Sequence, residues 1–153
     1  MSRYLAFISY RHHDRDQRIS ALLRRGLEGC RLPENTPLPK KRRVFRDTDE
    51  LPTSADLGED ISSALRESEW LIALCSPEYV ESKWCMREIR LFVEAGKKDR
   101  ILPVLVSGDP ETSIPPEIRD LPAAGDLRGV PGRSLRHAAD PVVFSLLAKM
   151  AGT

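Results

Sequence analysis

The sequence predicts an α/β fold in which a mostly parallel sheet carries helices on both faces. Short apolar runs typical of strands alternate with longer stretches whose apolar residues recur at helical spacing. One run, residues 70–76, is continuously apolar, as expected for a strand covered on both faces. The 153 residues are 41% hydrophobic and 31% charged, which is typical of one globular domain.

The first half of the chain contains two predicted strands and two predicted helices. Residues 4–9 (YLAFIS) are rich in strand formers. A helix follows, because Ile19, Leu23 and Leu27 recur at helical spacing and aspartates at 14 and 16 suit its start. A loop punctuated by prolines leads to a second short strand in RRVFRD, and EDISSALRES has the periodicity of another helix.

The second half continues the alternation. After the strand at residues 70–76, a helix is predicted from about Ser82 to Gly96, where glycine is a natural stop. RILPVLVSG is a fourth strand, whose Pro103 indicates a position near an edge or a bulge. A short fifth strand is predicted near residues 123–127. DPVVFSLLAKMAG closes the chain as a helix with Pro141 in its first turn.

Charge and cysteine content limit the function classes. A net charge of +1 is too balanced for a general nucleic-acid or membrane-surface binder. The three cysteines form no CxxC pair, which favours buried, reduced thiols and a cytoplasmic location. The first residues show neither a long apolar segment nor a cleavage-site pattern, so we expect no signal peptide and no membrane span.

A binding site is expected at the carboxyl ends of the predicted strands, near the point where the strand order reverses. The polar and aromatic residues there suit a nucleotide: arginine binds phosphate, rings cover a base, and a carboxylate accepts from ribose hydroxyls. The candidates are Ser9, Tyr10 and Arg11 after the first strand, Arg46 and Asp47 after the second, and Trp84 and Glu88 after the third.

Glu88 has an unusual place for an acid. In the helix predicted from Ser82 it lies four residues after Trp84, so the two share one surface. It also borders an apolar stripe that includes Cys85, Ile89 and Phe92. Most helix acids are solvated surface groups, and spacing alone leaves that interpretation open for Glu88, as it leaves core packing open for Trp84.

Four blocks of the sequence, in their order and spacing, resemble a TIR (Toll/interleukin-1 receptor) domain of bacterial type. They are FISYRHHDRD, VFRDTDELPTSADLGEDISSAL, WLIALCSPEYVESKWCMREI and RILPVLV. The resemblance is close over residues 4–106 and looser elsewhere. It implies a flavodoxin-like, doubly wound, five-stranded parallel sheet. Residues 1–153 would then be a single TIR domain, which we expect to be a module of a longer protein.

The resemblance also implies an activity. Some TIR domains are adaptors that only bind one another, whereas others, common in bacteria and plants, hydrolyse or cyclise NAD. In those enzymes the essential acid is a glutamate in a W-C-x-x-E pattern, which this chain carries from Trp84 to Glu88. The expected function is an NAD glycohydrolase of bacterial defence or signalling, with Glu88 catalytic. NAD is then the substrate, no cofactor is expected, and the product is ADP-ribose or a cyclic isomer.

One carboxylate is chemically sufficient for this reaction. Glycoside hydrolysis usually requires a second carboxyl group to protonate the leaving oxygen. Nicotinamide is already a cationic pyridinium in NAD and departs as a neutral base, so it requires no general acid. A single glutamate can stabilise the developing oxocarbenium-like ribose by its charge and hold the hydroxyls of that ribose.

Two other functions compete with the enzyme. The first is a non-catalytic TIR adaptor that acts by self-assembly. The second is a flavodoxin-like nucleotide-binding or receiver domain. A receiver is disfavoured because its phosphoacceptor aspartate should end a central strand, whereas the third strand here ends in Cys75 and Ser76.

The remaining motifs concern partners. By the resemblance, the loop from Thr48 to Gly58 would mediate contacts between TIR domains through Leu51, Pro52 and Leu57, although these leucines could instead pack onto the domain. The adjacent His12 and His13 lack the spacing and companions of a metal site. KKRR at 40–43 is more typical of a solvated loop than of a phosphate or partner patch, and neither a P-loop nor a G-x-S-x-G elbow is present. We expect NAD and other TIR domains as partners, with no nucleic acid, membrane or metal.

Overall fold

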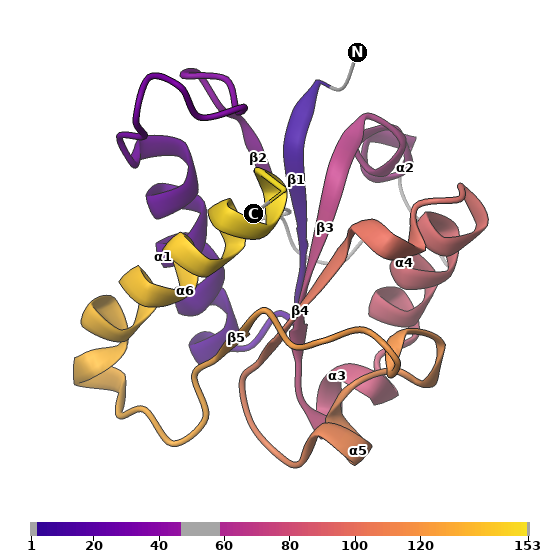
Figure 1. Cartoon of the computed structure of the whole chain (residues 1–153). Coiled ribbons are helices and arrows are strands. Elements are labelled where there is room, and N and C mark those ends of the chain that lie inside the picture. The colour runs from indigo at the N-terminus through magenta and orange to yellow at the C-terminus, as the bar shows by residue number, and fades with distance from the viewer. Residues whose placement is uncertain (1–2, 47–58, 153) are drawn as a thin grey trace.

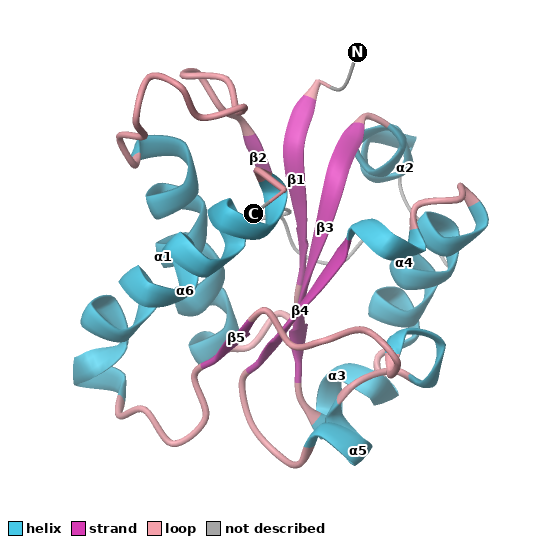
Figure 2. Cartoon of the chain, viewed as in Figure 1, coloured by secondary structure: helices cyan, strands magenta, loops and turns pink. Residues whose placement is uncertain are grey.

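The computed structural model describes residues 3–46 and 59–152, which form the alternating helices and strands of an α/β domain (Figures 1 and 2). The strands are β1 (Tyr4–Ser9), β2 (Val44–Arg46), β3 (Ser68–Cys75), β4 (Ile101–Leu105) and β5 (Gly125–Asp126). The α-helices are α1 (Asp14–Gly29), α2 (Glu59–Arg66), α3 (Pro77–Glu81), α4 (Lys83–Glu94), α5 (Pro110–Ser113) and α6 (Leu135–Met150). Within the described residues, the 3₁₀ turns are η1 (Lys98–Arg100), η2 (Pro116–Ile118) and η3 (Gly132–Ser134).

The strands of the described residues form one parallel sheet in the order β2-β1-β3-β4-β5. This confirms the predicted five-stranded, doubly wound, flavodoxin-like sheet. The order reverses between β1 and β3, where Ser9 pairs with Ala73. In such sheets ligands bind at the carboxyl ends of the strands beside this reversal. The topology therefore predicts a ligand site at the residues that follow β1 and β3.

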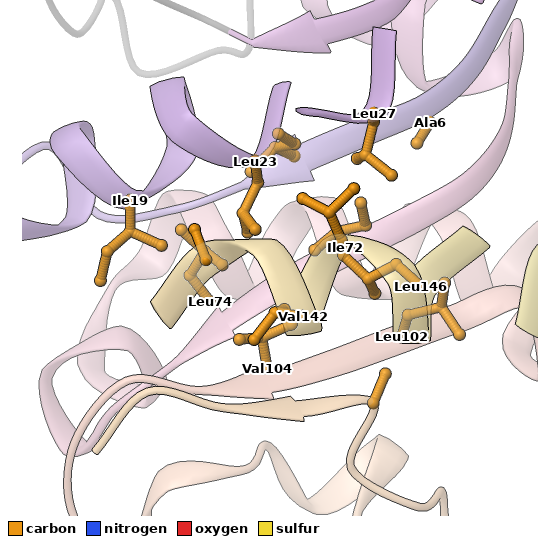
Figure 3. Close-up of a cluster of buried hydrophobic side chains, with 14 of the residues drawn as sticks. Ala6, Ile19, Leu23, Leu27, Ile72, Leu74, Leu102, Val104, Val142 and Leu146 are labelled. Atoms are coloured by element: carbon orange, nitrogen blue, oxygen red, sulfur yellow. The ribbon is translucent and has the colours of Figure 1, made fainter. Parts of the chain in front are cut away.

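Two apolar cores cover the two faces of the sheet. Figure 1 shows α1 and α6 on one face and α2 and α4 on the other. Strand β3 serves both faces: Ile72 and Leu74 point to the α1/α6 core (Figure 3), whereas Leu71 and Ala73 pack in the α2/α4 core. Because neighbouring strand residues point to opposite faces, burial on both sides requires the continuous apolar run seen in the sequence.

Local sequence explains why α1 and α4 form where they do. In α1, Ile19, Leu23 and Leu27 are completely buried at helical spacing. In α4, the side chain of Ser82 accepts a hydrogen bond of 3.2 Å from the backbone N–H of Cys85 and so caps the helix. Gly96 follows the end of α4 with a φ of +80°, a backbone conformation that glycine adopts without strain. None of the helices in residues 3–46 and 59–152 is long and apolar enough to cross a membrane.

The last helix differs from its prediction. We expected Pro141 in the first turn, but α6 begins at Leu135 and contains Pro141 in its interior. Proline cannot donate to the carbonyl of His137, so α6 lacks one backbone hydrogen bond at this point. Burial of Leu135 and Ala139 against the sheet extends the helix toward its N-terminus despite this loss.

Pro103 lies in an inner strand, beside an edge strand of only two residues. Its carbonyl accepts from the N–H of Ala124 at 2.6 Å, and the ladder to β5 starts one residue later, at Val104 and Gly125. The N–H and C=O of a strand residue face the same neighbour. The missing N–H of Pro103 therefore faces the short edge side and removes no bond to β3, which explains why proline is tolerated here.

Helix α3 is a feature that we did not predict from the sequence. It begins after Ser76, whose side chain accepts from the N–H of Tyr79 at 3.0 Å, and Pro77 occupies its first turn. These two residues form a capping signal directly after a strand. The helix buries Tyr79 completely at the carboxyl end of β3, beside the predicted site.

Candidate active site

Three polar side chains meet at the carboxyl ends of β1 and β3, inside the α2/α4 side of the domain. The Ser9 hydroxyl at the end of β1 donates to Glu88 Oε1 at 2.6 Å. The same oxygen lies 2.7 Å from the Tyr79 hydroxyl. Ser9 is 1% exposed, Tyr79 0% and Glu88 8%. Polar groups buried to this extent are either structural networks or functional sites.

Helix α4 delivers Glu88 to this position. Cys85, Ile89 and Phe92 pack into the α2/α4 core, and Glu88 lies beside them on the face that meets the end of β1. A helix rises about 1.5 Å per residue, so Glu88 lies more than one turn beyond the capped N-terminus. The solvated interpretation of Glu88 does not describe the structure, since its carboxylate is buried and accepts from Ser9.

The surroundings of Glu88 have a low polarity that alters neighbouring groups. Burial raises the pKa of Tyr79 well above its ordinary value, so its phenol stays protonated at neutral pH. Burial, followed by the charge of Glu88, raises the pKa of the Cys85 thiol to about 12. Burial also raises the pKa of Cys75 to about 12. Tyr79, Cys85 and Cys75 therefore remain protonated and neutral at physiological pH.

The thiols provide a direct test of this burial. At pH 8, a thiol reagent should modify the half-buried Cys30 rapidly but Cys75 and Cys85 very slowly, because only thiolates react. In denaturant all three should react at similar rates. Fast labelling of three thiols in native protein would contradict the structure.

The same thiols predict how stability depends on pH. Because burial raises the pKa of Cys75 and Cys85 in the folded protein, the unfolded protein loses these protons first, and the free energy of unfolding should fall as the pH rises from 9 towards about 12.

An acid of α1 approaches the same region. Asp16 is 4% exposed and accepts from Arg11 Nε at 3.3 Å. Burial raises the pKa of its carboxyl, and the Arg11 guanidinium opposes this. The charge of Asp16 also contributes to the raised pKa of Cys85. We predicted Asp16 only as a residue near the start of a helix. Its burial, like that of Tyr79, depends on contacts between distant elements that no local pattern reveals.

The other predicted residues are distributed around the strand ends. Tyr10 is 5% exposed and packs in the α1/α6 core, with its ring 4.8 Å from that of His12. Arg46 is half-buried, and its Nη1 donates to Ser20 Oγ of α1 at 3.0 Å. The structure thus places Tyr10 and Arg46 toward α1, while Ser9 joins Glu88. Asp47, Leu51, Pro52 and Leu57, with the whole loop at residues 48–58, lie outside the described residues.

Trp84 borders both the core and a cavity. Its half-buried ring packs against the α2/α4 core and lines a surface cavity of about 550 Å³. The cavity has an apolar wall and cationic side chains; its lining residues are Val80, Glu81, Ser82, Lys83, Trp84, Met86, Arg87 and Arg90. Neither Ser9 nor Glu88 lines this cavity, so the structure shows the core packing of Trp84, and its role as a wall for the substrate stays a prediction.

The histidines and acids that the structure describes do not gather into a metal centre. Within residues 3–46 and 59–152 no group of three His, Cys, Asp or Glu side chains is placed to hold a metal ion. His12 packs against the ring of Tyr10, and His13 precedes α1 as an exposed residue.

Comparison with solved structures supports the fold. The chain is similar to the TIR domains of the activated Roq1 resistosome that recognises the effector XopQ, with a TM-score of 0.55, 21% identity, and coverage of 98% of this chain and 84% of that one. It is also similar to a metazoan TIR-STING receptor from C. gigas in complex with 2′,3′-cGAMP, with a TM-score of 0.58, 21% identity, and coverage of 95% and 40%.

Comparison of sequences adds two curated relatives. The chain is 35% identical over 148 residues to NAD(+) hydrolase ApTIR of Actinoplanes sp., covering 88% of this chain and 19% of that protein. It is 31% identical over 116 residues to the probable 2′ cyclic ADP-D-ribose synthase BdTIR of Brachypodium distachyon, covering 76% and 46%. The chain thus spans less than half the length of either relative. The family model of the TIR domain matches residues 6–138, and the chain therefore belongs to the TIR domain family.

Proposed function

We propose that this TIR domain cleaves the bond between nicotinamide and ribose in NAD, and that Glu88 is its catalytic residue. The observation that carries the proposal is the carboxylate of Glu88, buried at the reversal of strand order and oriented by Ser9. Two relatives whose names state NAD hydrolysis and cyclic ADP-ribose synthesis support the same substrate.

The geometry suits stabilisation of a cationic transition state. As nicotinamide departs with the bonding electrons, positive charge develops on the ribose, and a nearby carboxylate lowers its energy. The site is largely shielded from water, since Glu88 is 8% exposed and its neighbours Tyr79 and Cys85 are neutral. A charge in such surroundings acts more strongly than one in bulk water.

Arg11 is the residue that we assign to the phosphates of NAD. Its side chain is 27% exposed, and Asp16 accepts from its Nε at 3.3 Å. A guanidinium fixed on one side retains donors for an anionic ligand on the other.

Water attack on the ribose gives ADP-ribose, and attack by a group of the same ADP-ribose gives a cyclic isomer. We place this reaction in bacterial defence or signalling in the cytoplasm, through NAD depletion or a cyclic product.

The test is incubation of purified protein with NAD, followed by separation of nicotinamide and mass spectrometry of the second product.

We also propose that TIR domains self-associate through the loop at 48–58. The assay should therefore span a wide dilution series, with light scattering on the same samples. The structural likeness to TIR domains of a resistosome supports this assembly. Specific activity should then rise with protein concentration. Failure to release nicotinamide at every concentration would refute the proposed function.

Trp84 provides a prediction on substrate holding. Trp84→Ala should lower kcat/KM for NAD about tenfold, because it removes an aromatic ring one helical turn from Glu88, and should lower the melting temperature because the ring packs on the α2/α4 core. Met86→Ala is the matched control, since Met86 lines the same cavity and packs on the same core. Thermal melts beside steady-state kinetics separate the two effects. Equal loss of activity in both variants would assign Trp84 a packing role alone.

A further inference from the structure

Tyr79 and Ser9 connect helix α3 to the carboxylate of Glu88 through two short hydrogen bonds. The Ser9 oxygen lies 2.7 Å from the Tyr79 hydroxyl and 2.6 Å from Glu88 Oε1. We propose that Tyr79 and Ser9 are positioning residues, forming a directed hydrogen-bond chain that orients and stabilises the ionised carboxylate of Glu88. The inference rests on the proposed function of Glu88 and extends it to two residues that do not need to touch NAD.

The direction of donation along this hydrogen-bond chain follows from the number of hydrogens that each group carries. Serine has one hydroxyl hydrogen, and an ionised carboxylate can only accept. Ser9 therefore donates to Glu88, which leaves the Ser9 oxygen as the acceptor for Tyr79. The phenol keeps its hydrogen at neutral pH, since burial raises the pKa of Tyr79 well above its ordinary range. The order is thus Tyr79 O–H to Ser9 O–H to the Glu88 carboxylate.

Each member of the chain is held by a different rigid element. Ser9 ends β1 in register with Ala73 of β3. Tyr79 is completely buried in α3, and its backbone N–H is bonded to the capping Ser76. Glu88 is carried by α4. A glutamate side chain has several rotatable bonds, and a partner fixed in this way restricts them to one arrangement before substrate binds.

The hydrogen-bond chain should also stabilise the ionised form of Glu88, on which the proposed reaction depends. A hydrogen bond to an ionised acceptor is about twice as strong as one between neutral groups. Successive hydrogen bonds polarise one another, so the donation from Tyr79 makes Ser9 a better donor. This explains why α3, a helix of five residues, buries a tyrosine rather than a phenylalanine at this point.

The kinetic test uses Ser9→Ala, Ser9→Thr and Tyr79→Phe. Ser9→Ala should lower kcat for NAD cleavage by about tenfold to a hundredfold, with less than about a threefold change in KM. Tyr79→Phe preserves the ring and the bond from Ser9, so kcat should fall by about threefold to tenfold. Ser9→Thr keeps the hydroxyl and should restore most of the activity lost in Ser9→Ala.

Ser68→Ala is the matched control. Ser68 is also a completely buried serine of the sheet, and its hydroxyl donates to the carbonyl of Ala64 at 2.6 Å. It pairs with Tyr4, at the opposite end of β1 from Ser9. Ser68→Ala should lower the melting temperature as Ser9→Ala does and leave kcat unchanged. A kcat that follows the melting temperature in all variants would overturn the positioning role.

A second measurement does not depend on activity. With glutamate carboxyl carbons labelled by ¹³C, the Glu88 signal is identified by its loss in Glu88→Gln and followed by NMR against pH. Removing a hydrogen-bond donor from a carboxylate disfavours its ionised form. The midpoint of the Glu88 titration should therefore move to higher pH in Ser9→Ala, and by a smaller amount in Tyr79→Phe. The label leaves Asp16 silent, and the raised pKa values of Tyr79 and Cys85 keep both from titrating in this range.

The two measurements separate the two proposals. If wild-type protein cleaves no NAD while the midpoint shifts as expected, the proposed function fails and the hydrogen-bond chain stands. If wild-type protein cleaves NAD while Ser9→Ala and Tyr79→Phe retain both its kcat and its midpoint, the chain is overturned and the function stands. Tyr79→Phe preserves the volume of a buried ring, so this variant tests the hydrogen-bond chain even if Ser9→Ala folds poorly.

Discussion

Glu88→Gln is expected to reduce nicotinamide release from NAD by at least about a hundredfold, because loss of one preorganised charge contact costs roughly 3 kcal/mol in the transition state. Glutamine retains an oxygen that accepts from Ser9 and fills the same space beside Cys85, so the fold should be preserved. The change removes the negative charge and replaces one carboxylate oxygen with an NH2 group of similar size. Turnover is measured from nicotinamide release at saturating NAD.

The control for this prediction is Glu94→Gln. Glu94 belongs to the same helix, α4, but is exposed to solvent. It loses the same charge from the same element and should keep wild-type turnover. Circular dichroism and thermal melts establish that both variants are folded. A folded Glu88→Gln protein with undiminished turnover would exclude Glu88 as the catalytic residue.

Gly108→Ala is expected to lower the free energy of unfolding by about 2–5 kcal/mol, the sum of backbone strain and overpacking. Gly108 follows β4 with a φ of +79°, which L side chains rarely adopt. A Cβ there would lie 2.7 Å from Cγ and Cδ of Pro77 and would collide with Ser113 Oγ. Pro77 belongs to α3, so relief of the clash would displace the helix that carries Tyr79.

Gly129→Ala separates the two causes of this loss. Gly129 has a φ of +72°, but apart from Gly129 and its two chain neighbours no heavy atom of the described residues lies within 4 Å of the Cβ position. It should cost about 1 kcal/mol from backbone strain alone. Urea unfolding of both variants measures the difference. If Gly108→Ala and Gly129→Ala lose equal stability, the close approach of Gly108 to α3 has no energetic importance.

The sequence was sufficient for the elements whose evidence is local. Strand β1 has its predicted bounds of residues 4–9, and α1 begins at Asp14 as its acidic start indicated. The run at 70–76 was recognised as a strand because burial on both faces leaves a continuous apolar pattern. The W-C-x-x-E pattern identified Glu88 as the candidate acid, although its catalytic role remains a prediction.

Features that depend on distant partners could not be predicted in this way. Ser9, Tyr79 and Glu88 are separated by up to 79 positions and meet only because β1, α3 and α4 converge beside the reversal of the sheet. Tyr10 packs toward α1, and Asp16 is buried, for the same reason. Periodicity reports which side of an element is apolar, whereas the neighbour that covers that side is set by the packing of the whole chain. The sequence could therefore supply Ser9 and Glu88 as candidates, while only the packing of three elements revealed Tyr79 and the hydrogen bonds that join the three side chains.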